Sequence, residues 1–307
     1  MRGLVIKSTG SSYIVRLDDG TNAECRIKGN FRIRGIRSTN PIAVGDYVEV
    51  QTLPDGTNWI AEIEERRNYI IRRSTNLSKE SHILASNIDQ VALIVTVNHP
   101  ETSTTFIDRF LATCEAYRVQ TILIFNKIDL LAEEELAHLE ELRALYEDLG
   151  YPTLAISAKN GDCSAVRNQL ADKVTLLSGN SGVGKSTLLN ALFGKELTRT
   201  GKISDAHDKG MHTTTFSEMY FLPEGGAVID TPGIKGFGSI DMKREEVGHY
   251  FREIFRVGRD CRFGNCTHTG EPGCAVHDAL ITGDIAISRY ESYLSMLDDT
   301  TEGKYRV

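Results

Sequence analysis

The sequence predicts a multidomain protein with an N-terminal β-barrel, a central α/β domain and a helical C-terminal unit. Three observations lead to this prediction. Short alternating apolar runs fill residues 1–75, strand-like and helix-like segments alternate over residues 76–240, and cysteine and histidine gather in the last part of the chain. We therefore expect three domains, at residues 1–75, 76–240 and 241–307, the last of which is small enough to need a bound metal.

About five strands are expected in the first domain, which fits a small Greek-key barrel of the OB type. These strands are Gly3–Ile6, Ser12–Leu17, Asn22–Ile27, Asp46–Gln51 and Trp59–Glu64. Residues 1–75 carry 12 Lys and Arg against 9 Asp and Glu, whereas the whole chain has a net charge of −7. The barrel is therefore the basic part of an acidic protein.

A segment of the barrel without acidic residues combines cations with one aromatic side chain, which suits RNA phosphates and an unstacked base. We predict RNA binding by Arg26, Lys28, Phe31, Arg32, Arg34 and Arg37. A charge run is usually a solvated face, so the prediction depends on the barrel around it. The acidic remainder of the chain argues against wholesale non-specific binding.

The central domain should contain a mainly parallel sheet covered by helices on both faces, with ligands at the carboxyl ends of the strands. The expected strands are Gln90–Val97, Thr121–Phe125, Thr153–Ile156, Val174–Leu177, Glu218–Leu222 and Ala227–Ile229. The expected helices are Phe106–Tyr117, Glu133–Leu149 and Ser186–Phe193.

A phosphate-binding loop lies between one of these strands and the next helix. Residues 179–186 fit G-x-x-x-x-G-K-[ST] in full. The glycines let backbone N–H groups face the phosphates, Lys185 reaches the β and γ phosphates, and the Ser186 hydroxyl can ligand Mg²⁺. A glycine-rich turn that binds nothing is the alternative, which the strand-loop-helix context disfavours. The predicted nucleotide contacts here are Gly179, Asn180, Ser181, Gly182, Val183, Gly184, Lys185, Ser186 and Thr187.

Two further motifs select the base. The strand Thr121–Phe125 ends in Asn126-Lys127-Ile128-Asp129, and the Asp129 carboxylate can accept from guanine N1–H and the exocyclic amine, a pair of donors that adenine lacks. The strand Thr153–Ile156 ends in Ser157-Ala158-Lys159, similar to a loop that supports guanine O6 through a backbone N–H. Each motif is a weak signal by itself. Because both stand at the ends of predicted strands, together they predict a guanine nucleotide.

The order of these motifs indicates a circular permutation. In the common GTPase layout the phosphate loop precedes the base-reading motif, whereas here Asn126–Asp129 comes first. The sequence therefore predicts a circularly permuted P-loop GTPase domain. The chain enters this domain near Gln90 and leaves it after Gly233. The new ends of the domain lie beside the region that senses the γ phosphate, which suggests that nucleotide state is passed to the flanking domains.

The γ-phosphate side has three candidate groups. Asp230, in Asp230-Thr231-Pro232-Gly233, would hold Mg²⁺ through water while the Gly233 N–H faces the γ phosphate, although Asp-x-x-Gly is also a common turn. One of the threonines at 213–215 should meet Mg²⁺. We assign Thr214, which the sequence does not distinguish from its two neighbours. The predicted magnesium ligands are Ser186, Thr214 and Asp230.

GTP hydrolysis needs a group that positions or deprotonates the attacking water. The position after Gly233 holds Ile234, which cannot orient water, so intrinsic hydrolysis should be slow. His212 is the nearest candidate, because a neutral imidazole can position or deprotonate water near pH 7. The alternative is a solvated loop histidine. The predicted catalytic residues are His212 and Lys185.

The cysteines divide into two groups. Cys25, Cys114 and Cys163 are dispersed and read as buried or incidental thiols, whereas Cys261, Cys266, His268 and Cys274 have the spacing of a tetrahedral structural Zn²⁺ site. An accidental cluster is the alternative. No secretory segment or membrane-length apolar run is visible, so we expect a reducing cytoplasm.

Helices should flank this loop. Residues 247–255 place five apolar side chains on one helical face, and Ala279–Leu297 reads as one further helix. Four arginines near the metal site suggest a second cationic surface: Arg252, Arg256, Arg259 and Arg262.

With these motifs assembled, the chain resembles the bacterial ribosome small-subunit-dependent GTPases, the RsgA or YjeQ family, over essentially its whole length. The resemblance implies a cytoplasmic GTPase that acts late in 30S maturation and contacts 16S rRNA through barrel and zinc domain. We expect the protein to be a monomer. The resemblance also implies turnover of GTP to GDP that is stimulated by the 30S particle, and a catalytic role for the histidine at position 212. Met211 stands where family members often carry a basic residue.

Two other functions remain open at this point. The protein can be a GTP-gated RNA-binding scaffold whose hydrolysis is incidental, or a GTPase that serves another RNA or a membrane. The lack of amphipathic anchor segments argues against the membrane.

Overall fold

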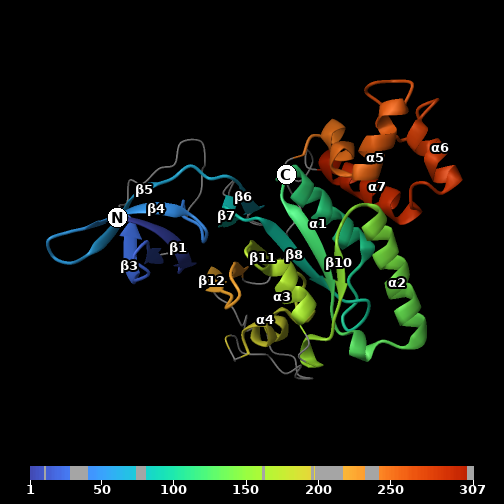
Figure 1. Cartoon of the computed structure of the whole chain (residues 1–307). Coiled ribbons are helices and arrows are strands. Elements are labelled where there is room, and N and C mark those ends of the chain that lie inside the picture. Colours follow the sequence, from blue (N-terminus) through green and yellow to red (C-terminus); the bar gives the residue numbers. More distant parts are fainter. Residues whose placement is uncertain are drawn as a thin grey trace.

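The computed structural model of the chain describes residues 1–9, 12–27, 41–73, 81–160, 163–194, 197, 217–231 and 242–302. The barrel, the central α/β domain and the C-terminal helices follow one another along the long axis of the molecule (Figure 1). No helix in these ranges is long and apolar enough to cross a membrane.

The N-terminal domain is a closed barrel of five strands, as predicted. These are β1 Arg2–Ser8, β2 Tyr13–Leu17, β3 Asn22–Ile27, β4 Tyr47–Thr52 and β5 Asn58–Ile63. They pair in the order β1-β2-β3-β5-β4, and β4 pairs back with β1 to close the barrel. Alternate side chains such as Val5, Val15 and Ile60 fill its core, which explains the apolar alternation in the sequence.

A two-stranded ribbon that we did not predict follows the barrel. Strands β6 Tyr69–Arg73 and β7 Ser81–Ser86 pair only with each other in the described chain. The expected boundary between the first two domains, at residues 75 and 76, falls between them. Buried Asp46 ties this region to the barrel, since it accepts from Arg66 at 2.6 Å and from the Ser86 hydroxyl at 2.6 Å.

The central domain has the predicted strands and the three predicted helices, together with one further helix, Ser164–Leu170, that was not predicted. Its strands are β8 Gln90–Val95, β9 Gln120–Phe125, β10 Thr153–Ala155, β11 Val174–Ser178, β12 Ser217–Phe221 and β13 Ala227–Asp230. Their order is β10-β9-β8-β11-β13-β12, parallel except for β12. Helices α1 Thr104–Ala116 and α2 Glu133–Asp148 cover one face, and α3 Ser164–Leu170 and α4 Lys185–Phe193 cover the other.

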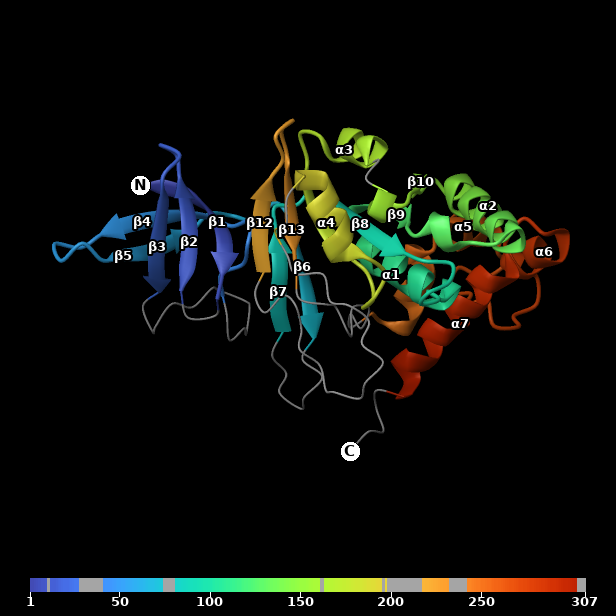
Figure 2. The same cartoon turned by 90° about the horizontal axis from the view of Figure 1, so that it is seen from below.

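The barrel and the central sheet are hydrogen-bonded to each other. Strand β1 pairs with β12 at Lys7↔Glu218 and Ser8↔Ser217, so the strands form one sheet through both domains (Figure 2). The Lys7 ammonium lies 2.9 Å from the Glu218 carboxylate. The barrel therefore sits one strand away from β13, whose last residue is Asp230.

The C-terminal domain differs from two expectations. The predicted helix Ala279–Leu297 is wrong: α6 Ala275–Thr282 and α7 Ile287–Glu302 are separate, because Gly283 takes a φ of +82° and ends the first. Residues 247–255 are also not one helix. A 3₁₀ segment, Arg244–Tyr250, gives way to α5 Arg252–Val257. Phe255 is therefore 41% exposed, although the pattern placed it on the same helical face as Val247 and Ile254, which are buried.

A buried charged cluster attaches these helices to the central domain. Arg289 of α7, 1% exposed, lies 2.8 Å from Asp108 of α1 and 2.7 Å from Glu253 of α5. Tyr146 of α2 and Ser292 of α7 also donate to Asp108. Since both carboxylates and the guanidinium have partners, the cluster fixes the C-terminal domain against α1 and α2.

Candidate functional site

The phosphate loop connects β11 to α4 at the carboxyl edge of the sheet, as predicted. Gly179, Gly182 and Gly184 have φ values of +144°, +87° and +97°, which side chains rarely adopt. A Cβ on Gly184 would collide with the Asn126 amide nitrogen, and one on Gly179 would collide with the Ile94 carbonyl. Glycine is thus required here by both backbone conformation and space.

Lys185, the first residue of α4, is folded back over this loop. Its ammonium donates to the Gly179 carbonyl at 2.6 Å and to the Asn180 carbonyl at 2.7 Å. Burial lowers the pKa of Lys185, while the nearby Asp230 carboxylate opposes the shift. The ammonium is therefore held against the backbone carbonyls of the phosphate loop.

Asn126, at the end of β9, joins the base-reading region to the phosphate loop. The side chain is 3% exposed, and its amide nitrogen donates to the Val183 carbonyl at 2.8 Å. Its amide oxygen accepts from the Ala158 N–H at 3.0 Å. One side chain thus fixes the relative position of three segments that are far apart in the sequence.

Asp129 lies beside the second base-reading loop. Ser157 donates to one Asp129 carboxylate oxygen at 2.5 Å, which orients the exposed carboxylate. The Ala158 N–H donates to the Asn126 amide oxygen. Lys159, the next residue of this loop, is exposed. The structure therefore brings together Asn126, Asp129 and Ser157 as the sequence predicts.

Asp230 ends β13 directly opposite the end of β11, with Leu177↔Asp230 in register. The residue is 5% exposed. The neighbouring Thr231 hydroxyl is buried and has no hydrogen-bond partner in the described part of the chain. Asp230 and Ser186 thus belong to the same edge of the sheet as the phosphate loop.

Several predicted residues lie outside the described ranges. On the γ-phosphate side these are His212, Thr213, Thr214, Thr215, Gly233 and Ile234. Among the predicted RNA contacts only Arg26 is described, as an exposed residue of β3, and the undescribed ones are Lys28, Phe31, Arg32, Arg34 and Arg37.

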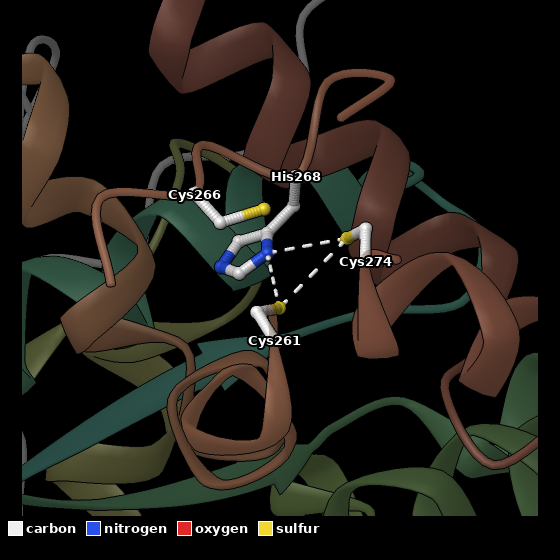
Figure 3. A group of neighbouring side chains, drawn as sticks. All are labelled: Cys261, Cys266, His268 and Cys274. Carbon is white, nitrogen blue, oxygen red and sulfur yellow. Dashed lines mark hydrogen bonds between the residues drawn. The ribbon is translucent and has the colours of Figure 1, made fainter. Parts of the chain in front are cut away.

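The C-terminal cysteines and histidine form a compact group (Figure 3). The ligand atoms of Cys261, Cys266, His268 and Cys274 all lie within 4.8 Å of one another. His268 Nδ1 is 3.5 Å from the sulfurs of Cys261 and Cys274, which are 4.0 Å apart. A regular zinc tetrahedron has edges of about 3.5 Å between nitrogen and sulfur and about 3.8 Å between two sulfurs. The donor set therefore fits zinc in kind and in size.

Other groups hold the loop in this shape. Glu271 accepts from the backbone N–H and the hydroxyl of Thr267 and from the Thr269 N–H, and these bonds lower the pKa of Glu271 to about 2 although burial opposes them. Tyr290 and Tyr293 of α7 donate to the carbonyls of His268 and Thr267, each at 2.6 Å. Burial lowers the pKa of His268, which keeps the imidazole in its neutral, ligating form.

Sequence reasoning missed one segment of the nucleotide edge, the loop 96–102 after β8. Pro100 packs against the phosphate loop, since a Cβ on Gly182 would lie 3.3 Å from its ring. The His99 carbonyl accepts from the Lys127 ammonium at 2.5 Å. The loop carries no recognisable motif; its position after a buried strand at the ligand edge was the available signal.

Comparisons with known proteins agree with this geometry. The family model described as RsgA GTPase matches residues 63–240, and the RsgA N-terminal domain matches residues 2–60. The small ribosomal subunit biogenesis GTPase RsgA of Phocaeicola vulgatus is 62% identical over 307 residues, with 100% of this chain and 99% of that protein covered. The protein of the same name from Porphyromonas gingivalis is 57% identical, with the same coverage.

Two solved structures are similar over the whole chain. The crystal structure of YjeQ from Thermotoga maritima has a TM-score of 0.76 and 34% identity, with 98% of each chain covered. The structure of YloQ, described as a circularly permuted GTPase, has a TM-score of 0.74 and 29% identity, with 100% of this chain and 96% of that chain covered.

Proposed function

The chain belongs to the RsgA GTPase family, and we propose that this GTPase acts in the biogenesis of the small ribosomal subunit, as the names of its relatives state for them. The hydrogen bonds of Asn126 are the observation that carries the guanine-nucleotide assignment, because they join the base-reading loops to the phosphate loop. The permuted order of the strands is the second support.

We assign the nucleotide contacts residue by residue. Asp129 reads the guanine edge, Lys185 neutralises the β and γ phosphates, and backbone N–H groups of the phosphate loop cradle them. Ser186, Asp230 and Thr214 would hold Mg²⁺, which supplies charge neutralisation between the β and γ phosphates when it is bound. The buried position of Asp230 opposite β11 supports its part in this set.

We propose that the protein works as a cytoplasmic monomer with three domains, the first ending before the β6–β7 ribbon and the last beginning at residue 241. Its partners are GTP, GDP and the 30S subunit, which it contacts through 16S rRNA. A closed barrel with basic residues such as Arg26 supports this assignment, because such barrels bind single strands on one face.

The experiment that tests this function compares GTP turnover by the protein alone, with 30S subunits, with 50S subunits and with free 16S rRNA. We expect slow turnover alone and a selective increase with 30S subunits. Equal turnover in all four conditions, with RNA affinity that still depends on GTP, would instead identify a GTP-gated scaffold.

Charge reversal at two of the predicted RNA-binding residues tests RNA contact. Arg32→Glu with Arg34→Glu should weaken binding to 30S subunits, and the slope of log affinity against log salt should become smaller by about two, because two phosphate contacts are lost. Both are measured by salt titration of binding. GTP binding by the free variant should match the parent, and an equal loss of both affinities would point to misfolding.

We further propose that Cys261, Cys266, His268 and Cys274 bind one structural zinc ion per chain. Elemental analysis should find about one zinc, and Cys261→Ser or Cys274→Ser should lose both the metal and the protease resistance of the C-terminal domain. Cys163→Ala is the matched control, because Cys163 is a buried thiol outside the cluster. A metal-free protein with an equally resistant C-terminus would contradict the proposal.

A further inference from the structure

The loop 96–102 is a rigid part of the nucleotide edge. Its two ends are joined, since the Thr96 N–H donates to the Thr102 hydroxyl at 3.2 Å and the Thr102 N–H donates to the Thr96 carbonyl at 3.0 Å. The Thr96 hydroxyl also donates to the Pro100 carbonyl. Both threonines are buried. The loop therefore presents its tip, Asn98 to Pro100, in a fixed position beside the phosphate loop.

The tip holds the lysine of the base-reading motif. Lys127 donates from its ammonium to the His99 carbonyl, and its side-chain stem passes close to Gly184, where an added Cβ would lie 3.9 Å from Lys127 Cε. Burial lowers the pKa of Lys127, while Asp129 opposes the shift. The Lys127 side chain thus lies between the phosphate loop and the tip of loop 96–102, beside Asp129.

A chain of hydrogen bonds fixes the tip to helix α2. The Asn98 amide oxygen accepts from the His99 N–H at 2.8 Å, and its amide nitrogen donates to Glu135 at 2.7 Å. The second Glu135 oxygen accepts from the Ala132 N–H at 2.8 Å, at the start of α2. Because Glu135 has one oxygen for each partner, it links the first turn of the helix, through Asn98, to His99, whose carbonyl accepts from Lys127.

We propose that Asn98 and Glu135 are positioning residues for the nucleotide, which act through the His99 carbonyl and the Lys127 ammonium. They touch neither the phosphates nor the reacting water. Their loss frees Lys127 from its place beside the base, so the nucleotide leaves faster while the chemical step at saturating GTP is unchanged. This inference rests on the proposed guanine-nucleotide site.

The test measures release of a fluorescent GDP analogue and kcat with saturating GTP and 30S subunits. Asn98→Ala and Glu135→Ala should each release GDP about tenfold faster, the order expected for one hydrogen bond to a charged group. In both, kcat should stay within about twofold of the parent. Glu135→Gln offers one acceptor oxygen in place of two, so its rate of GDP release should fall between those of the parent and of Glu135→Ala.

Two comparisons separate positioning from damage to the fold. Glu134→Ala removes the same charge from the same helical turn at an exposed residue and should leave GDP release unchanged. Lys127→Met keeps the stem but removes the ammonium, so Asn98→Ala should add nothing in that background. Asn98→Ala leaves the Glu135 bond to Ala132 in place, so its thermal unfolding midpoint should fall by no more than about 4 °C.

Unchanged release in Asn98→Ala would overturn the proposal, and so would a full additional effect in the Lys127→Met background. A parent protein that fails to bind guanine nucleotides would instead remove the proposed nucleotide site. The two failures are therefore distinguishable in one set of measurements.

Discussion

His212→Ala is expected to bind GTP and the 30S subunit as the parent does, and to lose most of the turnover that the subunit stimulates. The sequence supplies the reason: Ile234 follows Gly233, so no side chain at that position can orient water. If the subunit brings the imidazole to the attacking water, its removal costs general-base assistance, on the order of 10²- to 10⁴-fold in rate. A long-lived GTP-bound complex should accumulate.

The measurement is the ratio of stimulated to basal turnover in the parent and in the variant. His138→Ala is the matched control, because His138 is an exposed histidine of α2 paired only with Glu141 of its own helix in the described chain. Equal ratios in parent and His212→Ala would assign catalysis to another group, such as one supplied by ribosomal RNA, and would leave His212 as a solvated loop residue.

Asp129→Asn should exchange guanine for xanthine specificity. The carboxylate accepts two guanine donors, and loss of two hydrogen bonds to a charged group corresponds to about 3–6 kcal/mol, or roughly 10²- to 10⁴-fold in GTP affinity. The structure favours this change of base specificity. Ser157 donates to one Asp129 carboxylate oxygen, and an asparagine at this position still has an oxygen that accepts from Ser157. Its amide nitrogen is then available to the xanthine 2-oxygen.

Equilibrium binding of GTP and of xanthosine triphosphate measures the exchange. GTP affinity should fall and xanthosine triphosphate affinity should rise in the same variant. Asp148→Asn, which removes an equal charge from an exposed position at the end of α2, should change neither. GTP binding that survives Asp129→Asn at the parent's strength would remove the assignment of this carboxylate to the base.

The functional motifs are readable from the sequence because each is contiguous. The phosphate loop needs its glycines, lysine and serine within eight residues, since one strand-loop-helix unit makes the whole cradle. The candidate zinc ligands likewise fall within one short loop, since a metal can order a segment that has no core of its own. The rotated order of the motifs is also a property of the sequence, and the strand order confirms it.

Elements with weak local signals were missed or misplaced. The β6–β7 ribbon lacks a turn signature, because its connection, Ser74–Glu80, contains neither glycine nor proline. In the C-terminal domain the apolar spacing continued across Gly283, so the pattern predicted one helix where the chain makes two. The spacing of apolar residues predicts which side chains are buried, but it does not predict where the backbone turns between them.

The sequence by itself determined the three domains' character, the permuted motif order and the chemistry of each motif. Only the tertiary structure decided that Asn126 joins three segments, that β1 pairs with β12, that Arg289 fixes the C-terminal helices to α1, and that loop 96–102 holds Lys127. These contacts join residues far apart in the chain. Their partners are selected by packing and by the need to satisfy buried polar groups, which no local pattern of residues encodes.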